Sequence, residues 1–220
     1  MPSTEAILSS AAAIANGWRA LAIAWHVAII LLVAAIALGW RPSHRLLGLL
    51  LAVPLVSVSA LAWTSGNPFN GTTFALLALM VASIAMRLSK QPVDPASATN
   101  LTSGVLLFVF GWIYPHFLRA DSWIEYAYAA PLGLLPCPTL AAVLGITLLA
   151  GLFRSAAWTT TVAAAAFAYG SIGVFALGVS LDYALILGAA ILVIAGGRTA
   201  LTQRESRIII THVPARRSAV

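Results

Sequence analysis

Charged residues and cysteines are scarce in this chain, and both shortages exclude classes of protein. Only 8% of the 220 residues are charged and 61% are hydrophobic, a composition too apolar for a soluble domain. The single cysteine, Cys137, excludes an intramolecular disulfide and a CxxC pair. It leaves an inert thiol, an intermolecular bridge, or one ligand or nucleophile. The only lysine, Lys90, lies between apolar runs, which excludes a retinal protein.

Common enzyme signatures are also missing from the sequence. It contains no HExxH, GxSxG or Walker motif, and no paired acidic residues within an apolar run. The sequence therefore identifies no reaction and leaves enzymatic activity open.

The sequence instead contains seven long apolar runs. A bilayer core about 30 Å thick needs roughly 20 apolar residues per helical span, and the alternation of barrel strands is absent. We predict an all-α, polytopic transmembrane bundle of about seven helices, with the lipid bilayer as its partner. We expect the third and seventh runs to be short. The runs cover residues 19–39, 46–63, 72–86, 101–117, 132–153, 156–177 and 181–195.

The basic residues predict the orientation of this bundle. If seven helices alternate, nearly all Lys and Arg residues fall on one side, which the positive-inside rule assigns to the cytoplasm. The N-terminus is then outside and the C-terminus cytoplasmic. Residues 1–18 form a short N-terminal segment, an interfacial helix or a disordered start; residues 19–197 form the bundle and 198–220 a basic cytoplasmic tail. The net charge of +6 thus reflects membrane orientation, and nucleic acid is not expected as a partner.

The most unusual segment runs from Pro131 to Thr139, where Pro136 and Pro138 flank Cys137. A proline within a helix removes a hydrogen bond and clashes with the preceding turn, so we expect a helix break that frees carbonyls near Leu134 and Leu135. Soft sulfur beside free carbonyls favours a soft cation or a small polar solute.

A packing role for the same cysteine stays open. Cys137, Ala141 and Gly145 recur every four residues and form a stripe of small side chains. Another helix could pack against that stripe.

His26 is the second candidate, because an ionisable side chain inside a span is costly and often functional. It is either a ligand or a neutral imidazole that ties two helices together. We expect the site to lie in the outer half of the bundle beneath an acidic entrance, with Cys137 and His26 as metal ligands and no other cofactor. The candidate binding residues are Cys137, His26, His116, Tyr114, Asp121 and Glu125. Asp182, Asn67 and Asn70 also fall at this entrance, and no buried acidic residue is expected within a span.

A family resemblance rests on Tyr114-Pro115, Tyr128, Pro131 and the string from Gly133 to Thr139, followed by Gly145. This pattern resembles a family of uncharacterised bacterial multi-pass membrane proteins with a Tyr-Pro element and a Pro-Cys-Pro-Thr helix start. The chain departs from the pattern in having Ala141 and Ala142 soon after Thr139, in place of further Thr and Phe, and in lacking a Gly-His pair in the acidic loop. The resemblance implies a helical protein of the bacterial inner (cytoplasmic) membrane and supplies no activity.

These observations lead to one main functional hypothesis and two alternatives. The main one is a transporter or binding protein for a small solute or soft metal ion, with its site around Cys137. The alternatives are a non-catalytic membrane subunit or scaffold, and a membrane thiol redox component. The sequence does not indicate the substrate or the oligomeric state.

Overall fold

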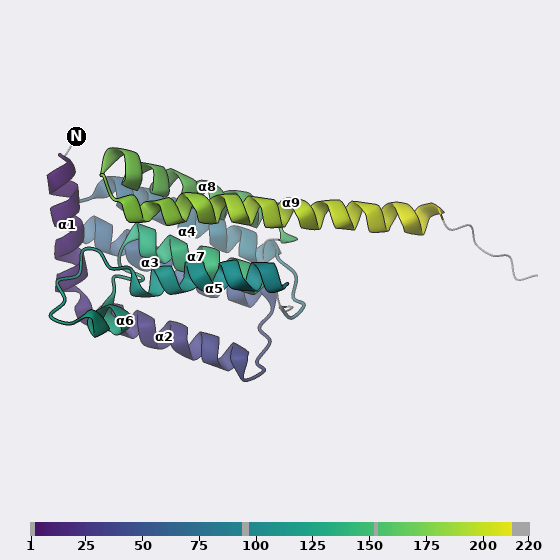
Figure 1. Ribbon diagram of the computed structural model, residues 1–220, viewed down its shortest axis with the longest axis horizontal. Helices are drawn as coiled ribbons and strands as arrows, with labels where there is room; N and C mark the ends of the chain where they lie inside the picture. Colours follow the sequence, from purple (N-terminus) through teal and green to yellow (C-terminus); the bar gives the residue numbers. More distant parts are fainter. Residues whose placement is uncertain (1–2, 94–96, 152–153, 213–220) are drawn as a thin grey trace, which may run out of the picture.

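A computed structural model shows an all-helical protein (Figure 1). It describes residues 3–93, 97–151 and 154–212, and side chains as far as residue 199. The main helices run side by side along one direction, and α1 (Thr4–Gly17) lies crosswise over one end of them. The side-by-side helices are α2 (Arg19–Ala37), α3 (His44–Thr64), α4 (Pro68–Arg87), α5 (Ala98–Ile113), α7 (Pro136–Leu149), α8 (Ala156–Ser171) and α9 (Tyr183–His212).

Short helical segments connect some of these helices. The loop after α5 contains a 3-10 turn, η1 (Trp123–Glu125), and the one-turn helix α6 (Tyr126–Ala129). A π-helical segment, η3 (Ile172–Ala176), continues α8, and a second 3-10 turn, η4 (Ser180–Asp182), leads into α9.

Five of these helical stretches are long and apolar enough to cross a membrane. Many of their large apolar side chains point outward, as Leu31, Leu79 and Leu187 do. Such a surface suits lipid better than water, so the fold is that of an integral membrane protein. The five stretches are Arg19–Ala37, His44–Thr64, Pro68–Arg87, Ala156–Ala176 and Ser180–Thr199.

The short apolar helices are not the two that the sequence predicts. The runs expected to be short lie in α4 and α9, which have 20 and 30 residues. The short helices are α5, with 16 residues, and α7, with 14. Proline explains one end of each: α5 ends before Tyr114-Pro115, because the residue before a proline avoids the helical conformation, and α7 starts only at Pro136. The total of seven spans and the orientation of the termini stay predictions.

The pairs that pack most extensively are α3 with α4, α5 with α7, and α8 with α9. Glycines allow the close approach of α5 and α7. A Cβ atom on Gly145 would lie 2.5 Å from the backbone nitrogen of Phe108 and 2.7 Å from the carbonyl oxygen of Gly104. Ala141 and Gly145 therefore face α5, as the packing interpretation of the small-residue stripe predicts.

At the opposite end of the bundle from α1, α9 extends beyond the other helices (Figure 1). The predicted tail begins inside this helix, which continues to His212. Residues 213–220 of the predicted tail lie outside the described part of the chain, as do Met1, Pro2 and Phe153 at the edges of other predicted segments.

The α5–α7 contact leads to a stability prediction. Gly145→Ala should lower the free energy of unfolding by about 1–3 kcal/mol, because the added methyl group meets backbone atoms that cannot rotate away. Gly197→Ala in α9 is the matched control, since nothing lies within 4 Å of its Cβ position. SDS-induced unfolding in detergent micelles measures both. Equal behaviour of the two variants would contradict the close contact.

Candidate functional site

The Asp182 carboxyl group lies at the centre of a buried polar cluster. Its side chain is 2% exposed. The hydroxyl of Tyr114 donates a hydrogen bond to Oδ1 at 2.7 Å, and the thiol of Cys137 donates to Oδ2 at 3.1 Å. Residues that follow α5, lie in the first turn of α7 and belong to η4 thus meet at one carboxyl group.

Tyr114 acts in this cluster as a neutral hydrogen-bond donor. Its side chain is fully buried. Its hydroxyl is the donor in the hydrogen bond to Asp182, so the phenol carries its proton in this arrangement.

The two prolines determine where α7 starts and so where Cys137 lies. Pro136 and Pro138 occupy the first turn, in which backbone N–H groups have no partner within the helix. The chain before Pro136 is not helical, as the sequence predicts, but the Leu135 carbonyl is not free. It accepts the Thr139 hydroxyl at 2.7 Å, and the same hydroxyl oxygen accepts the Gly133 N–H at 3.0 Å. The expected carbonyl ligand at Leu135 is therefore occupied by Thr139.

Gly173 makes room for the Asp182 carboxyl group. A Cβ atom at this position would overlap the carboxyl oxygen Oδ2. Gly173 belongs to η3, and π-helical segments are rare and often found at functional sites. The π-helical segment after α8 thus leaves space for the Asp182 carboxyl group.

A pocket of about 390 Å³ opens next to this cluster, and both Cys137 and Asp182 line it. Its other walls come from the start of α4, the end of α8 and the segment that leads to α9. Most of the lining is apolar, and Asn70 adds an amide whose Oδ1 accepts the Tyr169 hydroxyl at 3.0 Å. The pocket thus combines an apolar body with one strongly polar end.

Helix α1 covers this pocket with its apolar face. Its contribution to the pocket lining consists of Ile7, Leu8 and Ala11. The end of α1 is tied to the loop after α5, because Asn16 donates to the Phe117 carbonyl at 2.9 Å and accepts the Arg119 N–H at 2.8 Å. The cover is therefore held by hydrogen bonds that a single substitution can remove.

The structure places His26 apart from Cys137. Its Nδ1 lies 2.8 Å from the Ala22 carbonyl oxygen, and its Nε2 lies 3.0 Å from the carbonyl oxygen of Trp112 in α5. A neutral imidazole has one N–H and donates to one of these carbonyls at a time. Both ring nitrogens thus lie against backbone oxygens. The Nδ1 contact is within α2, and the Nε2 contact joins α2 to α5. The described lining of the pocket does not include His26.

The remaining predicted residues lie around the pocket rather than in it. His116 packs its ring against Phe117, at 4.1 Å between ring centroids. Glu125 forms an ion pair with Arg19 and accepts the Asp121 N–H at 3.1 Å. Asp121 and Glu125 therefore stabilise the loop beside the start of α2. Within the described residues, no group of three or more His, Cys, Asp or Glu side chains could hold a metal ion.

Sequence reasoning missed the central residue of this cluster. The sequence predicts a solvated entrance for Asp182 and no buried acid within a span, whereas the structure buries Asp182 at the start of the Ser180–Thr199 stretch. One feature of the sequence could have indicated a buried Asp182. It is the only acidic residue at the edge of this apolar run, and the segment between α8 and α9 has few other polar residues. Nothing in the sequence pointed to Gly173.

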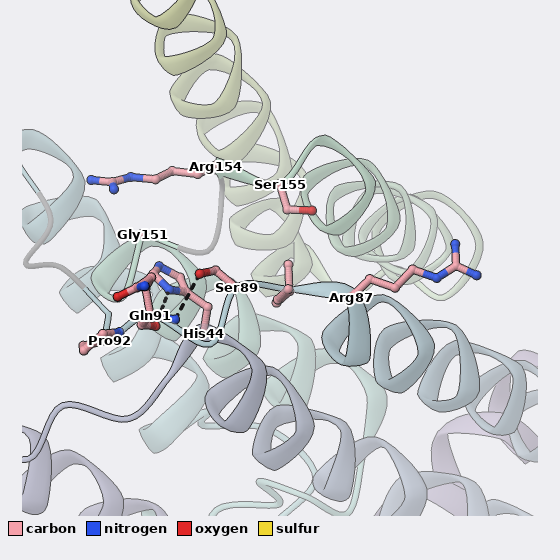
Figure 2. A pocket seen from close by; sticks show the side chains of 9 residues that line it. His44, Arg87, Ser89, Gln91, Pro92, Gly151, Arg154 and Ser155 are labelled. Atoms are coloured by element: carbon pink, nitrogen blue, oxygen red, sulfur yellow. Dashed lines mark hydrogen bonds between the residues drawn. The ribbon is translucent and has the colours of Figure 1, made fainter.

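A second, larger cavity of about 680 Å³ lies among the loops at the other end of the bundle. Figure 2 shows His44, Ser89 and Gln91 grouped together, while Arg87 and Arg154 point away from this group in opposite directions. The His44 ring contacts the Gln91 carbonyl oxygen at 3.0 Å. Because the two guanidinium groups do not converge, the smaller pocket with the buried acid is the better candidate site.

The Tyr114–Asp182 hydrogen bond leads to a testable prediction. Tyr114→Phe should lower the free energy of unfolding by about 1–3 kcal/mol, because a buried carboxyl group loses a donor. Tyr128→Phe, at a 44% exposed side chain, should change it little. Thermal unfolding in detergent compares the two variants, and equal melting temperatures would contradict the buried hydrogen bond.

The tie between Asn16 and the loop predicts how α1 controls access to Cys137. Asn16→Ala should speed alkylation of Cys137 by N-ethylmaleimide severalfold, because α1 then leaves the pocket more often. Intact-mass spectrometry follows the reaction, and the signal is specific because the chain has one cysteine. Asn100→Ala, at the start of α5, is the control. An unchanged rate in Asn16→Ala would show that α1 does not limit access.

The family resemblance of the Tyr114 and Cys137 segments finds no counterpart in comparisons with known proteins. No family model, no curated protein and no solved structure matches this chain.

Proposed function

We propose that this membrane protein binds a small organic solute in the pocket beside Asp182, as the binding step of solute transport. The observation that supports this proposal is a carboxyl group, 2% exposed, that lines an apolar pocket of about 390 Å³. Sites for small molecules typically measure about 300–1,000 Å³ and combine apolar walls with a few placed polar groups.

The chemistry of the pocket indicates how a solute is oriented. Its hydrogen-bond-donating end lies against Asp182, while its apolar part lies against Leu8 and Ile172. Burying a polar group without a partner costs several kcal/mol, so a solute that offers a donor at the correct end is favoured over one that does not. The carboxyl group thus provides both orientation and selectivity.

A soft metal ion suits this site less well than an organic solute. Cys137 and Asp182 provide two ligands, and a metal ion would need the thiolate, whereas the thiol keeps its proton and donates a hydrogen bond to Asp182. The same contact argues against a thiol redox role, because a neighbouring carboxylate disfavours the reactive thiolate. Cys137 is therefore proposed as part of the binding surface.

The proposal also includes the membrane in which the protein lies and the side from which the solute enters. The distribution of Lys and Arg supports a cytoplasmic membrane, with the pocket and α1 at the outer end of the bundle, and we propose a bacterial one. A solute would then enter the pocket from outside, beneath α1. A scaffold protein would not need an enclosed pocket with a polar end, but it would share the same helices.

A screen of small solutes with a blocked-pocket variant tests this proposal. At least one solute should raise the melting temperature of the purified protein by several degrees. Ala11→Trp places a large side chain in the pocket and should abolish that shift. Ala13→Trp adds the same side chain to the exposed face of α1 and should keep it.

Two outcomes would count against solute binding. One is a screen in which no solute stabilises the wild-type protein. The other is a solute whose stabilisation is the same in Ala11→Trp and in the wild type. Both would favour the scaffold alternative, in which the polar residues only join helices.

A further inference from the structure

We propose that the solute is an organic cation, such as an amine or quaternary ammonium compound, whose charge lies against Asp182 and whose apolar part fills the pocket. This inference rests on the proposed solute-binding function and names the class of solute. It depends on the charge and the acceptor capacity of one buried carboxyl group, and on the aromatic side chains around it.

The bonding of Asp182 is that of an acceptor. Each of its oxygens accepts one hydrogen bond, from Tyr114 and from Cys137. A carboxylate offers about four lone-pair sites, so two such bonds leave room for a further donor. Asp182 also lies directly before the N-terminus of α9, where the helix dipole favours negative charge.

Asp182 has no salt bridge within the described part of the protein. His116, whose ring packs against Tyr114, is close enough to act on the carboxyl group electrostatically, but no salt bridge joins the two. The described lining of the pocket also contains no basic residue. Buried charges in proteins are normally paired, so a cation that enters the pocket supplies the partner that the protein does not.

The walls of the pocket suit the apolar part of such a cation. Phe69, Phe117 and Tyr169 bring aromatic rings to the lining. Aromatic rings attract ammonium groups through their electron-rich faces, most strongly where water is excluded. Most of the other lining side chains are aliphatic, which excludes strongly hydrated inorganic cations in favour of organic ones.

A charged probe and its uncharged isostere test this inference on the full-length protein. Benzyltrimethylammonium and neopentylbenzene have nearly the same shape and differ in one nitrogen and one charge. Each compound is titrated against the alkylation of Cys137, which lines the same pocket. The cation should reach half-protection at a concentration about tenfold to a hundredfold lower than its isostere, because its charge is attracted to the carboxylate and to the aromatic rings without any hydrogen bond.

Substitutions then assign this difference to Asp182. Asp182→Asn keeps the shape of the side chain and should remove the preference for the cation. Asp121→Asn removes an exposed acid outside the pocket and should leave the preference intact. The wild-type comparison of the two probes requires no variant, so the inference stays testable even if Asp182→Asn does not fold.

The outcomes separate this inference from the proposed function. Equal protection by the two probes would overturn the cation assignment and leave solute binding in place. A preference for the cation that survives in a folded Asp182→Asn protein would also overturn it. Protection by neither probe would reject organic cations of this shape, and the Ala11→Trp screen would then decide whether the pocket binds any solute.

Discussion

The hydrogen bonds from Tyr114 and Cys137 to Asp182 satisfy a carboxyl group that has little access to water. Inside a bundle that crosses a bilayer, a polar group must find its partners within the protein. That requirement brings the end of α5 and the starts of α7 and α9 to one place. It also explains a glycine at position 173, because a side chain there would displace the carboxyl group.

The sequence allowed the fold class to be predicted because hydrophobic length is a strong and local signal. The apolar runs predicted an all-helical membrane protein, and five of the helical stretches are long and apolar enough to span a membrane. Helix lengths were harder to predict, since one residue can end or begin a helix within an apolar run. Pro115 follows the end of α5 and Pro136 begins α7, where composition alone suggested longer spans.

The candidate site was predicted only in part, for a physical reason. Cys137, Pro136 and Pro138 stood out because proline acts on its own stretch of chain, and Cys137 does line the pocket. Asp182 lies 45 positions further along the chain, and only the packing of α7 against α9 brings it to Cys137. The roles of His26 and Ala141 were left open in the sequence for the same reason, since each depends on the opposing helix α5.

The short length of α7 has a consequence for the water around a solute. At about 1.5 Å per residue, its 14 residues cover roughly 21 Å, less than the hydrocarbon thickness of about 30 Å. Its first turn lines the mostly apolar pocket that α1 covers. A solute that reaches Asp182 must leave most of its hydration shell behind. Among solutes of equal shape, the protein would then favour those that lose water easily.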